Sequence, residues 1–262
     1  GVQTCALPIS DGDVVAPSAI SLKSFGQQKE HDAREMTAEE IEQTIRDFGE
    51  ATRRAIEAGF DGVEIHGANH YLIHQFVSPY YNRRNDVWAD NYKFPVAVID
   101  EVVKAKKAHA YDDFIIGYRL SPEEAESPGI SMEITEELIH QIANKPLDYI
   151  HVSLMDVNSV TREGKYKGEN RLELIHQWIN GRMPLIGIGS VFTAEDALNA
   201  VENIGVEFVA LGREILLDYD FVAKIKEGRE DEIINAFDPN REDQHYLTPN
   251  LWEQFNQGFY PL

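Results

Sequence analysis

Short apolar runs and longer amphipathic segments alternate along most of the chain. The five runs are residues 61–66, 114–118, 149–153, 185–188 and 207–211. The segments with apolar residues at helical spacing are 37–58, 94–110, 134–144, 171–180 and 193–203. Short apolar runs between helices are typical of a parallel sheet whose strands are buried on both faces. The pattern therefore predicts an α/β fold, either a barrel or a doubly wound sheet.

Local signals mark where the first helix begins and ends. Thr37 and Glu40 have the spacing of a capping box, in which the hydroxyl and the carboxylate bond the first exposed backbone amides. Gly59 follows the last apolar position and ends the helix. Before this helix, residues 11–25 have no clear periodicity and are predicted to form a loop.

Composition limits the classes of protein to consider. At 262 residues the chain is long enough for one α/β barrel, which takes about 250 residues, or for two smaller domains. The net charge of −21 makes nucleic acid and anionic membranes poor partners. A single cysteine, Cys5, excludes an intrachain disulfide framework and a cysteine-ligated cluster. No apolar run reaches about 20 residues and no signal peptide is evident, so we expect a cytoplasmic protein.

Polar side chains crowd the point where the run 61–66 gives way to a helix. His66, Asn69 and Tyr71 lie within six residues there. In α/β folds such positions occupy the carboxyl edge of the sheet, where ligands bind. Two hydrogen-bond donors and a phenol suit a reaction in which a carbonyl compound gains electrons and a neighbouring carbon gains a proton. The residues alone equally allow these side chains to bond buried backbone groups.

Three histidines in this stretch, His66, His70 and His74, stand four residues apart. Histidines at that spacing can share a helix face and bind a metal ion. His66 belongs to the strand end, however, and no carboxylate or cysteine follows at ligand spacing. We therefore expect no metal site, with one of His70 and His74 on the surface and the other packed inside.

Two later glycine-containing turns indicate an anion site. Gly189 and Ser190 follow the run 185–188, and Gly212 and Arg213 follow the run 207–211. Each turn alone reads most simply as a tight turn. Together, on consecutive strands of a barrel, they favour a phosphate site to which the arginine adds a cation. No G-x-G-x-x-G follows a strand, so a dinucleotide-binding Rossmann unit is not supported.

The sequence G-F-D-G-V-E-I-H-G-A-N-H-Y-L-I-H-Q-F-V-S-P-Y-Y-N-R-R, which begins at Gly59, resembles the signature of the old yellow enzyme family of FMN-dependent NAD(P)H oxidoreductases and ene reductases. The resemblance implies that His66 and Asn69 bind the substrate carbonyl and that Tyr71 supplies the proton. It also implies that Arg119 lies against the flavin ring, where a cation stabilises the anionic reduced flavin.

The same resemblance extends from about residue 11 to the end of the chain. It implies that Gly189, Ser190, Gly212 and Arg213 bind the FMN phosphate, and that NADH or NADPH is the reductant. Two features depart from the family pattern: His70 replaces a usual glycine, and residues 85–93 are shorter than the matching family segment.

Five strands are too few for a (β/α)8 barrel. The resemblance identifies them as barrel strands four to eight, so the expected fold is a partial TIM barrel. Residues 11–262 are then the C-terminal part of one FMN-binding domain, and residues 1–10 lie outside the family pattern. A five-stranded arc leaves two open edges. We therefore expect this chain alone to be marginally stable or prone to aggregate.

These features together predict an FMN-dependent NAD(P)H oxidoreductase that passes hydride from reduced flavin to an activated alkene. The partners to consider are a small-molecule substrate and, in a homo-oligomer, a second copy of the chain. One alternative is a flavin-independent phosphate-binding barrel enzyme. That class needs a Schiff-base lysine or metal-binding carboxylates at strand ends, and the lysines here lie mainly on helices and loops. The other alternative is a non-catalytic fragment.

Overall fold

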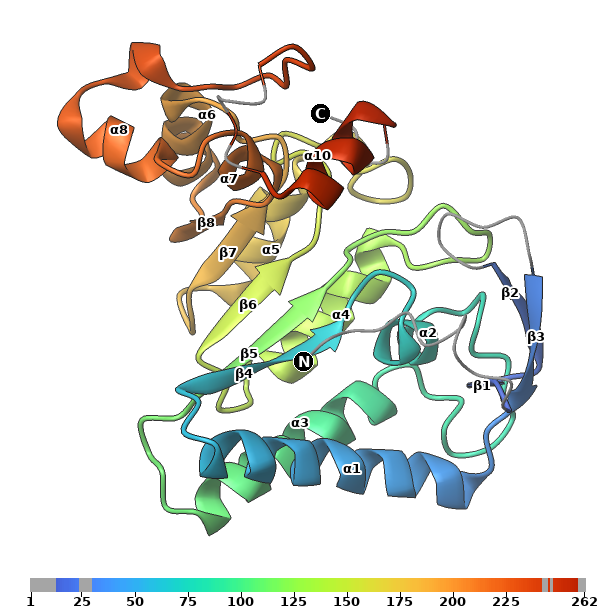
Figure 1. Cartoon of the computed structure of the whole chain (residues 1–262). Helices are drawn as coiled ribbons and strands as arrows, with labels where there is room; N and C mark the ends of the chain where they lie inside the picture. The colour runs from blue at the N-terminus through green and yellow to red at the C-terminus, as the bar shows by residue number, and fades with distance from the viewer. Residues whose placement is uncertain (1–12, 24–29, 242–244, 246, 259–262) are drawn as a thin grey trace.

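A computed structural model describes residues 13–23, 30–241, 245 and 247–258 (Figure 1). Its strands are β1 Val15–Ala16, β2 Ile20–Lys23, β3 Glu30–Glu35, β4 Gly62–Gly67, β5 Ile115–Leu120, β6 Tyr149–Val152, β7 Leu185–Ile188 and β8 Phe208–Ala210. Its helices up to β7 are α1 Ala38–Glu57, α2 Leu72–Val77, α3 Lys93–Ala108, α4 Met132–Ile142 and α5 Arg171–Ile179. The C-terminal part adds α6 Ala194–Asn199, a π-helical turn Ala200–Ile204, α7 Arg213–Leu217, α8 Phe221–Glu227, a 3₁₀ turn Glu230–Glu232 and α10 Pro249–Asn256.

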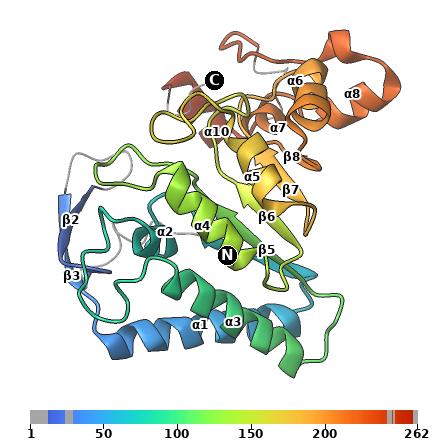
Figure 2. The ribbon, with the colours of Figure 1, turned by 180° about the vertical axis from the view of Figure 1, so that it is seen from behind.

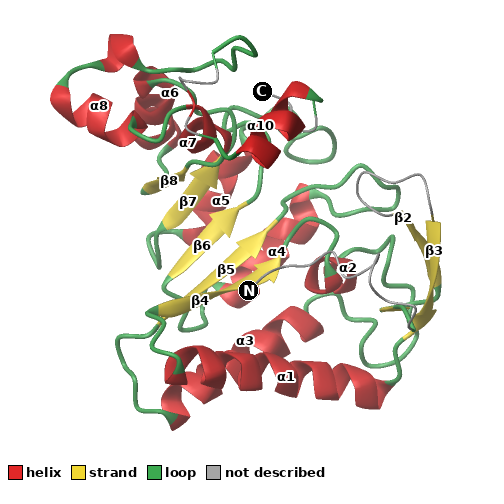
Figure 3. Cartoon of the chain, in the orientation of Figure 1, coloured by secondary structure: helices red, strands yellow, loops and turns green. Residues whose placement is uncertain are grey.

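The central element is a five-stranded parallel sheet in the order β4-β5-β6-β7-β8. Every pairing in this sheet is parallel, as the arrows of β5, β6 and β7 show in Figure 3, so the carboxyl ends of the strands share one edge. Helices α4 and α5 lie across the face seen in Figure 2, and α1 and α3 pack together beside β4 and β5. The predicted partial barrel, made of the last five strands, is confirmed. Strands β4 and β8 are the two edges of this sheet.

The two faces of the sheet differ in what they contact. Toward the helices, Ile65, Tyr118 and Ile150 are almost completely buried. On the opposite face, Ile115 is 44% exposed and Phe208 57% exposed. The expectation that the strands are buried on both faces is therefore wrong for this chain, because nothing in its described part covers the concave face.

A second, small sheet precedes α1 and has the order β1-β3-β2. Within the described residues 13–23, strands β1 and β2 correct the prediction that residues 11–25 form only a loop; the rest of that range lies outside the described residues. The guanidinium of Arg84 ties this sheet to the loop after α2, because its Nη1 donates to the carbonyl oxygens of Pro17 and Met36, both at 2.7 Å. The backbone amide of Arg83 also donates to the hydroxyl of Ser18 at 2.8 Å.

Helix boundaries follow the predicted capping signals. Thr37 accepts from the amide of Glu40 at 3.2 Å, and the Glu40 carboxylate accepts from the amide of Thr37 at 2.8 Å. Thr193 and Asp196 repeat this capping box at the start of α6. That helix is shorter than predicted, because its last turn, Ala200–Ile204, is π-helical. Among the described residues, no helix is both long and apolar enough to span a membrane.

Two phenylalanines of opposite environment test the packing. Phe76 of α2 is fully buried and stacks on Phe94 of α3, with ring centroids 4.0 Å apart. Phe76→Ala should lower the free energy of unfolding by ~3–5 kcal/mol, because it leaves a cavity in the core. Phe60 is 62% exposed, so Phe60→Ala should change it by less than about 0.5 kcal/mol. Urea denaturation measures both; equal effects would contradict the described packing.

Candidate functional site

The corner between β4 and α2 carries the predicted catalytic residues. After Gly67 ends the strand, Asn69 and His70 adopt left-handed backbone conformations with φ of 57° and 60°. Tyr71 is the N-cap of α2, and its ring centroid lies 5.0 Å from that of His66. The tight turn therefore places the strand-end imidazole and the phenol beside each other.

Two serines, each directly after a neighbouring strand, hold the side chain of Asn69 in place. Its Oδ1 accepts from the hydroxyls of Ser121 at 3.3 Å and Ser153 at 3.1 Å, and its backbone amide donates to Ser121 Oγ at 3.0 Å. Ser121 follows β5 and Ser153 follows β6. Because the oxygen is engaged, the side chain presents its amide Nδ2 as a donor. Sequence reasoning missed both serines, since they lie far from Asn69 along the chain.

Arg119 of β5 joins the same group. It pairs in register with His66 across the two strands, and its Nη2 donates to Ser153 Oγ at 2.9 Å. Arg119 Nε and His66 Nδ1 are buried and have no hydrogen-bond partner among the described residues. Buried polar atoms in folded proteins are nearly always bonded. These two atoms therefore mark a place where a polar ligand fits.

His66 is held as a neutral imidazole. Burial lowers its pKa, and the positive charge of Arg119 lowers it further. A neutral imidazole has one N–H donor and one acceptor nitrogen. His66 can therefore donate one hydrogen bond to a substrate oxygen.

The concave face carries one more polar cluster that the sequence did not reveal. Glu64 accepts from Nδ1 of His151 at 2.9 Å and from the hydroxyl of Tyr149 at 3.1 Å. Burial is the largest single influence on the Glu64 carboxyl and opposes its ionisation, but the bonds from His151 and Tyr149 and the nearby positive charges together lower its pKa. Glu64 lies two residues before His66, so alternation along β4 puts both on this face.

The predicted phosphate turns lie at the ends of β7 and β8. Gly189 has φ of 129°, and a Cβ there would lie 2.5 Å from the amide nitrogen of Asp156, so only glycine fits. Ser190 donates to the carbonyl oxygen of Met155 at 2.8 Å and accepts from Arg213 Nη2 at 3.3 Å. Gly212 directly precedes α7 and has open space around it. The carbonyl oxygen of Met155 and the guanidinium of Arg213 thus meet at the Ser190 hydroxyl.

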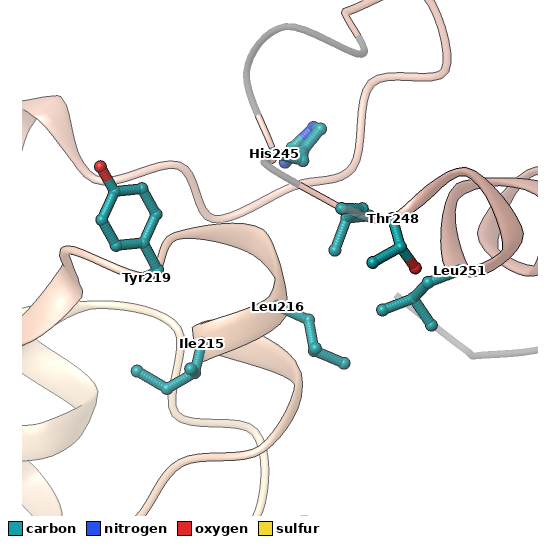
Figure 4. Close-up of a pocket in the computed structure, with 7 residues that line it drawn as sticks. Ile215, Leu216, Tyr219, His245, Thr248 and Leu251 are labelled. Carbon is teal, nitrogen blue, oxygen red and sulfur yellow. The ribbon is translucent and has the colours of Figure 1, made fainter.

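The structure brings the predicted residues to one edge of the sheet in two groups. His66, Asn69, Tyr71 and Arg119 gather at β4 and β5, whereas the turns containing Ser190 and Arg213 lie at β7 and β8. The loop after β6 connects the groups, because Ser153 bonds the first and Met155 bonds the second. A cavity of about 420 Å³ lies elsewhere, between α7 and α10 (Figure 4). None of the predicted site residues lines it.

The two remaining histidines of the corner have the environments expected of them. The side chain of His70 is 49% exposed and that of His74 is 1% exposed. The structure adds a carboxylate that spacing could not reveal. Nε2 of His74 lies 2.7 Å from Oε2 of Glu124, a residue of the loop after β5.

The comparisons with known proteins agree with this arrangement. Residues 7–232 match the sequence profile of the NADH:flavin oxidoreductase / NADH oxidase family. The chain belongs to this family. As a member of it, the chain has the fold and sequence motif of the old yellow enzymes, so the resemblance drawn from the motif at residues 59–84 is confirmed.

Two relatives illustrate how much of a family protein this chain represents. It is 45% identical over 267 residues to the probable NADH-dependent flavin oxidoreductase YqiG of Bacillus subtilis, covering 100% of this chain and 70% of that protein. It is 39% identical over 248 residues to the NADH:fumarate oxidoreductase of Klebsiella pneumoniae, covering 91% of this chain but 26% of that protein.

Solved structures show the same fold. The old yellow enzyme homologue from Zymomonas mobilis matches with a TM-score of 0.70 at 20% identity, over 96% of this chain and 68% of that one. Morphinone reductase in complex with tetrahydroNAD matches with a TM-score of 0.67 at 23% identity, over 91% and 68% of the two chains.

A buried carboxyl next to the phosphate turn gives a pH-dependent prediction. Glu214 of α7 is 1% exposed, and both its carboxylate oxygens have no partner among the described residues. Burial, together with the carboxylate of Asp218, raises its pKa to about 8. The unfolded chain releases this proton near pH 4.5, so stability should fall as the pH rises from 4.5 to 8.

Glu214→Gln should remove this dependence. At pH 8 the variant should be more stable than the wild type by ~1–3 kcal/mol, and at pH 4.5 the two should be nearly equal. Exposed Glu42→Gln is the matched control and should change neither value. Thermal unfolding at both pH values provides the measurement. A Glu214→Gln variant less stable than wild type at pH 8 would show that the carboxylate is ionised and paired.

Proposed function

We propose that this chain is the C-terminal part of an FMN-dependent NAD(P)H oxidoreductase that reduces an activated alkene, such as an α,β-unsaturated carbonyl compound. One observation carries the proposal. His66 and Arg119 lie side by side on β4 and β5, and each has a buried nitrogen without a partner in the described structure. A flavin ring with a carbonyl substrate above it offers acceptors of the kind that both groups require.

The residues present fit an FMN molecule along the carboxyl edge of the sheet. Arg119 would lie against the flavin ring, and the turns containing Gly189, Ser190, Gly212 and Arg213 would hold the phosphate. The open space at Gly212 and the guanidinium of Arg213 suit a dianion. When bound and reduced by NADH or NADPH, FMN supplies the hydride for the β-carbon of the alkene.

The corner after β4 would activate and protonate the substrate. His66 and the Nδ2 amide of Asn69 donate hydrogen bonds to the carbonyl oxygen, where negative charge develops as hydride arrives at the β-carbon. Tyr71 donates its phenolic proton to the α-carbon and regains a proton from water. Hydride and proton together add one molecule of H₂ across the double bond. The serines that bond Asn69 keep its amide directed at the oxygen.

The visible spectrum tests the proposal directly. The purified full-length protein that contains this chain should be yellow, with flavin absorption that bleaches when NADH or NADPH is added without oxygen. It should regain its colour when an α,β-unsaturated ketone or carboxylate follows. A colourless protein that binds no added FMN would refute the flavoenzyme function.

Tyr71→Phe separates the two half-reactions. Alkene reduction should slow by roughly 100-fold or more, because the proton donor is lost, whereas reduction of the flavin by NADH should be unchanged. Tyr111→Phe is the matched control, since Tyr111 lies at the opposite, amino-terminal end of β5. Stopped-flow absorption measures both steps. Equal alkene turnover in Tyr71→Phe and wild type would remove Tyr71 from the mechanism.

A further inference from the structure

The corner after β4 contains a second group of polar side chains that the proposed reaction does not use. One ligand atom each from His70, His74 and Glu124 lie within 4.8 Å of one another. The two histidines come from the corner and from α2, and Glu124 comes from the loop after β5. Two elements that are separate in sequence therefore present three potential metal ligands to one point.

The Glu124 carboxylate is oriented for this role. Its Oε1 accepts from the hydroxyl of Ser78 and from the backbone amide of Ile130, the latter at 2.9 Å. Its Oε2 faces the imidazoles and lies 2.7 Å from His74 Nε2 and 3.8 Å from His70 Nδ1. Bonds of this kind behind a metal-binding carboxylate fix its direction. One oxygen is thus anchored by protein donors and the other is directed between two imidazoles.

The histidines complement this carboxylate. The side chain of His74 is 1% exposed, and its Nε2 lies 2.7 Å from Oε2 of Glu124, so a neutral imidazole with its proton on Nδ1 directs the Nε2 lone pair toward the carboxylate side of the group. The backbone of His70 is held where its carbonyl oxygen accepts from Gln75 Nε2 at 2.7 Å. Its side chain is 49% exposed, which provides a path for an ion to enter.

We propose that His70, His74 and Glu124 form a binding site for one transition-metal cation, with Zn²⁺ as the ion that matches the ligand set. Two imidazole nitrogens and one carboxylate oxygen are common zinc ligands, and a site with three protein ligands keeps one position for water. The ion takes the place of the hydrogen bond between Nε2 of His74 and Oε2 of Glu124, and the single proton of the neutral His74 imidazole moves to Nδ1.

The geometry needs only a small adjustment to hold the ion. Zinc bonds of 2.0–2.2 Å at tetrahedral angles place ligand atoms roughly 3.3 Å apart. His74 Nε2 and Glu124 Oε2 are 2.7 Å apart, so these two side chains must separate slightly to admit the ion. The half-exposed His70 ring supplies the remaining movement, turning from its contact with the Tyr81 hydroxyl at 3.3 Å. The bound ion would join the catalytic corner to the loop after β5.

Calorimetric titration of ZnCl₂ into the EDTA-treated and dialysed protein tests the site. The wild type should bind one Zn²⁺ per chain and show a higher melting temperature with the ion. His70→Asn should weaken binding at least tenfold. Asparagine suits this test because it tolerates the left-handed backbone at position 70 and because the replaced side chain is half exposed, so the variant should fold normally.

His176→Ala is the matched control. Its imidazole is also partly exposed and lies 3.2 Å from a carboxylate oxygen of Glu207, but it belongs to no three-ligand group among the described residues. This variant should bind zinc as the wild type does. Absence of stoichiometric binding, unchanged affinity in His70→Asn, or an equal loss in His176→Ala would each overturn the proposal and leave a hydrogen-bonded His74–Glu124 pair.

Discussion

Parallel pairing of β4 to β8 in a fixed register is the constraint on which every other feature of the site depends. Parallel strands place all their carboxyl ends at one edge, and alternation sends every second side chain to the same face. His66, Arg119 and His151 therefore stand in one row across three strands. A shift of one residue in any strand would send that member of the row into the helix-covered core.

The periodicity of the sequence was sufficient to predict the central sheet and its helices. Apolar runs such as Leu185–Ile188 are bounded by glycine or proline, and the capping pairs are local signals. Strand β3 escaped prediction because its sequence, E-H-D-A-R-E, has no apolar alternation. It is a strand because it pairs with β1 on one side and β2 on the other. Such pairing forms only when the chain folds, so the local sequence of β3 does not reveal it.

The site was predictable only where its residues are neighbours in the chain. The corner containing His66, Asn69 and Tyr71 is short, and its motif identified it. Ser153, 84 residues after Asn69, and Glu124, 50 residues after His74, meet these side chains only in the folded chain. Spacing gave no reason to expect a carboxylate beside His74. Likewise, only the fold shows that the Glu214 carboxyl is buried with no hydrogen-bond partner among the described residues.

The consecutive left-handed conformations of Asn69 and His70 have a wider consequence. Residues with a Cβ disfavour this backbone by about 1 kcal/mol each, so the turn persists because surrounding contacts hold it. For Asn69 those contacts are hydroxyls on two other loops. A molecule that displaced either loop would allow the turn to relax and would move the side chain of Asn69 without touching it. The geometry of the candidate site therefore depends on the loops that follow the two neighbouring strands.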